Sequence, residues 1–164
     1  MMPLFLFLLF ELTLKQQLYL LKQICPNCSV IGVIAVKDQS QEKAADLLKN
    51  STYYNVKLEV EYVKKINDLS KGLQNLLDKK IEFLWIFDDS VNGDPMALRF
   101  LVTKTQENKI PIICGSEKQL QFGATYFFTI NNEGQVVVKI KKASANALKL
   151  TLPEREDLKI EIVE

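Results

Sequence analysis

Short apolar runs recur along the chain and are separated by segments with helical spacing. Residues 30–36 and 81–87 are almost entirely apolar. Such runs are typical of parallel strands covered on both faces. Residues 56–63 alternate between apolar and polar positions, which indicates a strand at a sheet edge. Together with two shorter runs, the predicted parallel strands are residues 30–36, 56–63, 81–87, 110–114 and 124–130.

Helices are predicted between these strands because apolar residues recur there every three or four positions. We expect Asp38 or Ser40 to cap the helix that follows the first strand, and Asp94 with Pro95 to begin a later one. The predicted helical segments are residues 12–24, 38–51, 67–77, a long helix from 94, 117–122 and 143–150. The side chains expected to pack inward in the second and fourth helices are Ala44, Ala45, Leu47, Leu48, Met96, Leu98, Leu101 and Val102.

The C-terminal part of the chain breaks the alternation of strands and helices. Asn131–Gly134, written Asn-Asn-Glu-Gly, lies between two strand-like runs and predicts a β-hairpin. Residues 158–163 alternate and predict a final strand. The predicted fold class is α/β, a doubly wound, Rossmann-like, mostly parallel five-stranded sheet with a C-terminal β-hairpin, and residues 12–164 are predicted to form a single domain.

Residues 1–11 form an apolar N-terminal segment. The apolar run ends at Glu11, short of the roughly 18 residues that a membrane span needs. A basic start and a small-residue cleavage site, which mark export signals, are missing. Three interpretations remain open: an export signal, a remnant of a longer protein, and an element that packs on the domain.

Composition narrows the function classes. The chain has 164 residues, with 21 Lys and Arg against 20 Asp and Glu, and it has no His. The balanced charge argues against nucleic acid as a partner. The absence of His removes the Ser-His and Cys-His pairs and most zinc sites. A conventional hydrolase is therefore not expected, although composition alone does not name a function. No metal is predicted, and no cofactor, since Gly-x-Gly-x-x-Gly and Walker motifs are absent from the sequence.

Polar residues follow several of the predicted strands. In an open parallel sheet, ligands bind at the carboxyl ends of the strands. The loops expected at that edge contain residues 37–40, 88–93, 115–117 and 131–132. These residue types also cap helices and make turns, so a purely structural role is the first interpretation of these loops and ligand binding the second.

Two motifs have chemical interpretations of their own. Asp88 and Asp89 have a second interpretation as a metal site or a phospho-acceptor pair, because they are similar to the acidic pair of receiver domains. Receivers, however, have that pair after the first strand and a lysine after the fifth, and neither feature is present here. Cys25 and Cys28 form a CxxC that ends a helix rather than opening one, an order that does not favour a reactive thiolate. The interpretations of the pair, in order of preference, are an inert loop pair, a local disulfide, and a redox or metal site.

Several segments together resemble one protein family. They are residues 24–34, 81–89, 95–101, 108–117 and 145–154, the last of which contains Leu-Thr-Leu-Pro-Glu. This pattern resembles ABC transporter substrate-binding proteins of the tryptophan and tyrosine type, which have the type I periplasmic-binding-protein fold. The family has two lobes that close on a ligand, and only the equivalent of the second lobe is present here.

The resemblance implies a non-enzymatic protein that binds an amino-acid-like small molecule in the periplasm. Its expected partner is an ABC permease or another envelope protein. A homodimer is expected if a second copy supplies the missing lobe. It places the ligand against Lys37, Asp38, Asp88, Asp89 and Ser116. The hairpin followed by a helix is also similar to small periplasmic repressors. This similarity keeps open a ligand-free interaction module that regulates an envelope partner.

Overall fold

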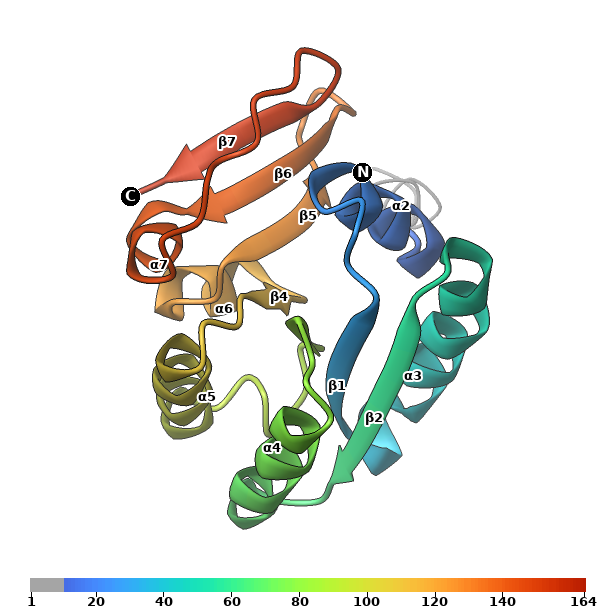
Figure 1. The fold of residues 1–164 in the computed structure, drawn as a ribbon, viewed down its shortest axis with the longest axis vertical. Coiled ribbons are helices and arrows are strands. Elements are labelled where there is room, and N and C mark those ends of the chain that lie inside the picture. Colours follow the sequence, from blue (N-terminus) through green and yellow to red (C-terminus); the bar gives the residue numbers. More distant parts are fainter. Residues whose placement is uncertain (1–10) are drawn as a thin grey trace, which may run out of the picture.

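A computed structural model describes residues 11–164. Of the N-terminal segment 1–11, only Glu11 is described, so its three interpretations lie outside the described residues. The described residues share one seven-stranded sheet with the strand order β2-β1-β3-β4-β5-β6-β7 (Figure 1). The strands are β1 Val30–Val36, β2 Lys57–Val63, β3 Phe83–Ile86, β4 Ile112–Cys114, β5 Tyr126–Ile130, β6 Val136–Lys141 and β7 Lys159–Val163.

The strand pairing confirms the predicted fold class. Strands β1 to β5 run parallel, with β2 at the edge as its alternating pattern predicts. The predicted hairpin is present: β6 pairs antiparallel with β5, and Gly134, at φ 76°, closes the turn by donating its N–H to the carbonyl of Asn131. The sheet extends beyond the predicted hairpin because β7 pairs with β6 in parallel.

Helices cover both faces of the sheet (Figure 1). The helices are α2 Leu14–Ile24, α3 Lys37–Ser51, α4 Leu69–Asp78, α5 Pro95–Glu107, α6 Glu117–Phe122 and α7 Lys142–Ala147, with short 3-10 helices η2 Thr52–Tyr54 and η3 Ile66–Asp68. Buried side chains of α2 and α3 belong to one core, and those of α4, α5 and α6 belong to the other. The sheet therefore separates two apolar layers, as in other doubly wound domains.

Local capping explains where several helices begin. The Thr13 hydroxyl accepts the N–H of Gln16, and the Gln16 side chain accepts the N–H of Thr13, which makes a capping box before α2. As predicted, Asp94 caps α5 and Pro95 occupies its first turn.

The predicted cap of α3 is wrong. This helix begins at Lys37 directly after β1, without a side-chain cap, so neither Asp38 nor Ser40 caps it. Ser40 instead donates its hydroxyl to Asp89 across the carboxyl edge of the sheet.

Three predictions of inward packing are also wrong. Ala45 is exposed, and Leu48 and Met96 are 48% and 75% exposed. These side chains lie on the outer sides of α3 and α5. The predictions are wrong because helical spacing shows which residues share a face but not how wide the buried part of that face is.

Candidate functional site

Asp89, in the loop after β3, is bonded to the junction of β1 and α3 at the carboxyl edge of the sheet. One carboxylate oxygen, Oδ2, accepts the backbone N–H of Val36 at 3.1 Å and the hydroxyl of Ser40 at 2.9 Å. The other oxygen, Oδ1, accepts the N–H of Asn92 at 2.8 Å. Both carboxylate oxygens of Asp89 are therefore already engaged in hydrogen bonds with groups of this chain.

Asn92 extends these hydrogen bonds into the core. Its side chain is fully buried, and Nδ2 donates to the carbonyl of Ile34 at 2.9 Å and to Asp89 at 3.2 Å. The N–H of Gly93 donates to the carbonyl of Asp89 at 2.8 Å, which closes the turn. A Cβ at Gly93 would lie 2.8 Å from that same carbonyl oxygen, so the turn requires glycine.

Gln119 joins the loops after β3 and β4. Its Nε2 donates to the carbonyls of Phe87 and Asn92, and its Oε1 accepts the N–H of Gly115. Ser116 caps α6 by accepting the N–H of Gln119 at 3.2 Å. Sequence reasoning missed Gln119, although Ser-Glu-Lys-Gln has the spacing of a capping box and draws attention to the glutamine.

The remaining predicted site residues lie at the same edge but face solvent. Lys37 and Asp38 are exposed in the first turn of α3, and Asp88 is exposed after β3. Beside them, the N–H of Ser90 donates to the side chain of Gln39 at 2.7 Å. The structure thus brings Asp88, Asp89 and Ser116 to adjacent loops. It leaves Lys37 and Asp38 exposed in the first turn of α3, apart from that group.

A hollow of about 460 Å³ opens between the carboxyl ends of β3 to β5 and the start of α2. Its apolar part includes Trp85, Phe87 and Phe128, and its polar part includes Lys43, Asp46, Asp88 and Thr129. The other lining residues are Glu11, Leu12, Thr13, Leu14, Gln17, Gly115 and Phe127. Aromatic walls with a few charged groups at the rim are typical of small-molecule sites.

Only Asp88 of the five predicted residues lines this hollow. Lys43 and Asp46 were missed because they lie in the second and third turns of α3, where the sequence pattern shows only an exposed helical face. The segment 11–14 was missed because nothing local indicates that the start of α2 lies against the ends of three distant strands.

The buried thiol beside the hollow is a structural group. Burial raises the pKa of Cys114 to about 12, and the nearby negative charge of Asp88 acts in the same direction. Its single S–H has two carbonyl acceptors within reach, that of Ser116 at 3.3 Å and that of Tyr126 at 3.4 Å. A thiol that is protonated and hydrogen-bonded in this way is a poor nucleophile.

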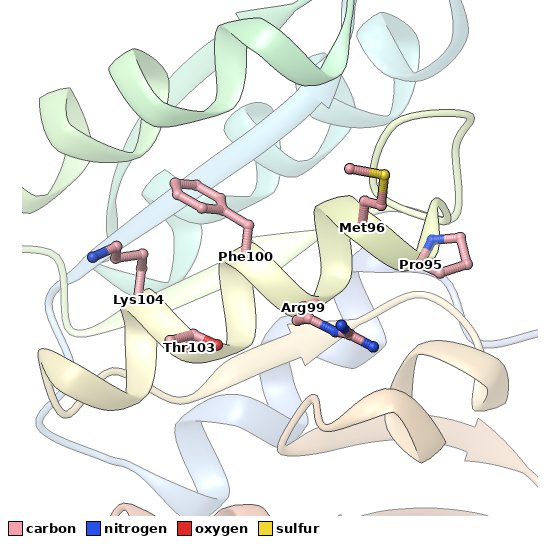
Figure 2. Close-up of a pocket in the computed structure, with 6 residues that line it drawn as sticks. All are labelled: Pro95, Met96, Arg99, Phe100, Thr103 and Lys104. Carbon is pink, nitrogen blue, oxygen red and sulfur yellow. The ribbon is translucent and has the colours of Figure 1, made fainter.

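A second depression, of about 400 Å³, lies on α5 (Figure 2). All six lining residues come from this one helix. Met96 and Phe100 project from one side of α5, and Arg99 projects from another (Figure 2). Because no polar groups converge on it from neighbouring elements, the depression lacks the arrangement of a specific site.

Cys25 and Cys28 lie between α2 and β1, at the opposite edge of the sheet from the hollow, and both are free thiols. Burial, and then the neighbouring Cys25, raise the pKa of Cys28 to about 12. Within residues 11–164 no three His, Cys, Asp or Glu side chains are grouped to hold a metal ion. Over the same residues, no helix has the length and apolar character to cross a membrane.

The model of the family described as ABC transporter substrate binding protein matches residues 11–154. The chain belongs to this family. As a substrate-binding family, it is a class of binding proteins rather than of enzymes, and its members normally work outside the cytoplasm. No curated protein sequence matches the chain significantly.

Solved structures similar to this family member share its fold at low sequence identity. A conserved domain protein from Vibrio cholerae O1 biovar El Tor is 18% identical, with TM-score 0.74, over 86% of this chain and 56% of that one. An ABC domain from Streptococcus pneumoniae, in complex with L-Trp, is 17% identical, with TM-score 0.75, over 92% and 60%. A substrate binding protein with adhesive properties from Clostridium difficile, in a ligand-free, open structure, is 19% identical, with TM-score 0.78, over 93% and 61%.

The chain therefore spans less than two thirds of each of these structures. At such identities the likeness establishes the periplasmic-binding-protein type of fold for this family member. The resemblance read from the sequence is confirmed at the level of the family and of the fold.

Proposed function

We propose that this chain is a single-lobe ligand-binding component of an ABC-type uptake or sensing system and that it holds an amino-acid-like molecule at the carboxyl edge of its sheet. The observation that supports this most is the hollow lined by Trp85, Phe87 and Phe128. It lies where open parallel sheets bind ligands, and the edges of these three largely buried aromatic side chains form its apolar floor.

The rim of the hollow carries charges of both signs. Lys43 suits a carboxylate, and Asp46 and Asp88 suit an ammonium group. A free amino acid has both groups on one carbon, so one molecule can place its side chain among the aromatics and its charges at the rim. The L-Trp in the Streptococcus pneumoniae structure is a ligand of this class.

The other predicted residues support the site indirectly. Because both oxygens of Asp89 are bonded to the loops, this residue holds Asp88 in place rather than contacting the ligand. Ser116 and Gln119 do the same for Gly115, which lines the hollow. The same bonds disfavour a phospho-acceptor role for Asp89.

The hollow opens to solvent, so a ligand held by this lobe alone is only partly enclosed. We infer modest affinity for the isolated chain, with tighter binding when another protein covers the open side. The family suggests that this partner is an ABC permease or another envelope protein, and that the contact takes place outside the cytoplasm.

The test is isothermal titration calorimetry with a panel of free L-amino acids, beginning with L-Trp, L-Tyr and L-Phe. We expect saturable binding of an aromatic member and at least tenfold weaker binding by Lys43→Gln and Asp88→Asn. Lys49→Gln is the matched control, because Lys49 is exposed on the same helix and does not line the hollow. A folded protein that binds none of the panel contradicts the proposal and favours the ligand-free interaction module.

A further inference from the structure

Strand β7 has an unpaired outer edge. Its only neighbour in the sheet is β6, and it is the last strand in the order, so among residues 11–164 no strand pairs with its other side. Figure 1 shows β7 at the outer margin of the sheet, far from α3 and β2. A row of free N–H and C=O groups at such an edge is a template for another strand.

The side chains of β7 divide into two kinds by face. Ile160 and Leu158, the residue just before β7, pack on the core that also contains α2, and Ile162, which shares their face, is 39% exposed. Lys159 and Glu161 lie on the opposite face. The edge therefore offers an apolar row on one face, and on the other two opposite charges followed by Val163, which packs on the second core.

This pattern is complementary to itself. When a second copy of β7 is placed antiparallel about a two-fold axis at Ile160, each Lys159 lies opposite the Glu161 of the other copy. On the other face Leu158 lies opposite Ile162, and Ile160 lies opposite its own counterpart. Opposite charges and apolar pairs directly across an antiparallel ladder both stabilise it.

The charges also select the register. A two-fold axis moved to Glu161 places the two Glu161 carboxylates opposite each other, and like charges in that position destabilise the pairing. Among residues 11–164, Glu161 has one ion pair, with Lys139 at 3.9 Å, and Lys139 lies much closer to Glu117, at 2.8 Å, so Glu161 has little competition there. At the other edge of the sheet, Glu59 is already held by Lys57 and Lys79, each at 2.9 Å.

We infer that two copies of this chain associate through antiparallel pairing of their β7 strands, which joins the two sheets into one continuous sheet. The two-fold axis is perpendicular to the sheet, so α2 and α3 of both copies lie on the same face. The carboxyl ends of β1 to β5 then point in opposite directions in the two copies. The hollow of one copy is consequently not covered by the other, and the inference does not depend on what the hollow binds.

The test is the molar mass of the full chain, measured by sedimentation equilibrium over a wide range of concentrations. We expect a reversible monomer–dimer equilibrium for the native sequence. Lys159→Glu and Glu161→Lys are each expected to shift it toward monomer, because each places like charges opposite one another twice. Lys118→Glu makes the same charge change as Lys159→Glu at an exposed position on α6 and is expected to leave it unchanged.

Two further samples distinguish the proposed register from a general effect of charge. In an equimolar mixture of the two single variants, each charge again faces its opposite, so we expect heterodimers although neither variant pairs with itself. The double variant Lys159→Glu/Glu161→Lys is expected to recover the dimer. Circular dichroism and the melting temperature of each variant show that it is folded.

A native protein that stays monomeric at all concentrations overturns the inference. So does a dimer that folded Lys159→Glu and Glu161→Lys variants leave unchanged, or a mixture of those two variants that remains monomeric. None of these results bears on amino-acid binding, which the calorimetry measures separately.

Discussion

The hydroxyl of Ser40 donates a hydrogen bond to Oδ2 of Asp89 at 2.9 Å, although the two residues are 49 positions apart in the chain. The bond joins the start of α3 to the loop after β3. The same oxygen also accepts the N–H of Val36, so the Asp89 carboxylate fixes the loop after β3 against the junction of β1 and α3, at the edge where the hollow opens.

This arrangement predicts that Asp89→Ala lowers the stability of the protein without any ligand present. Removing the carboxylate leaves the part-buried N–H of Val36 and the hydroxyl of Ser40 without their acceptor, and we expect a loss of about 1–3 kcal/mol in the free energy of unfolding. Urea unfolding measures it. Asp38→Ala is the control, because Asp38 is an exposed carboxylate in the first turn of α3. A variant as stable as the native protein that no longer binds an amino acid makes Asp89 a ligand contact instead.

Two glycines are predicted to respond to alanine in opposite directions. A Cβ at Gly93 lies 2.8 Å from the Asp89 carbonyl oxygen, so Gly93→Ala forces the backbone of the loop to move and is expected to cost about 1–3 kcal/mol. Gly72 lies inside α4, where a Cβ meets its nearest atoms at 3.6 Å. Gly72→Ala is expected to stabilise the protein by about 0.5–1 kcal/mol, because glycine is a poor helix former. Thermal unfolding of both variants tests the pair, and destabilisation by Gly72→Ala contradicts it.

The sequence predicts the sheet well because each parallel strand is marked by its own residues. Residues 83–86 are apolar and all four are buried, as a central strand between two helical layers requires. The hairpin follows from Asn131 and Gly134, whose preferences are local.

The site is less predictable because it is assembled from distant segments. The sequence shows Ser40 only as a hydroxyl near the start of a helix, and its acceptor is 49 residues away. Lys43 and Asp46 have the pattern of an ordinary exposed helix face, and only the packing of α3 against the sheet places them at the hollow. Local preference identifies the loops, whereas tertiary packing decides which side chains converge.

Glu82 is predicted to make stability depend on pH at the opposite edge of the sheet. Burial alone raises its pKa, but hydrogen bonds from the N–H and hydroxyl of Ser29 and from the N–H of Val30 outweigh that effect and hold the pKa below its ordinary value of 4.5. A carboxylate with a lowered pKa in the folded state stabilises the protein above its unfolded pKa. That contribution is lost as the pH falls through the folded value.

Glu82→Gln is therefore expected to reduce stability at neutral pH, with a difference from the native protein that shrinks steadily below pH 4.5. Urea unfolding over a series of pH values measures this difference. Glu133→Gln, in the exposed turn of the hairpin, serves as the control and should show no such trend. A difference that is constant with pH means that the loss comes from the hydrogen bonding of the amide, and that the charge of Glu82 contributes nothing.

The three thiols are predicted to differ in reactivity after full reduction. Cys28 and Cys114 are both 1% exposed, and burial raises the pKa of each to about 12, so almost none of either is in the thiolate form at pH 8. Cys25 is partly exposed. A thiol reagent such as iodoacetamide should modify the folded protein at Cys25 alone, and unfolding in urea should release the other two. Peptide mass spectrometry identifies the modified residue, and Cys25→Ser should leave the folded protein unlabelled. Rapid labelling of Cys28 in the folded state would mean that the end of α2 opens readily from β1, because only separation of these segments gives the reagent access to that sulfur.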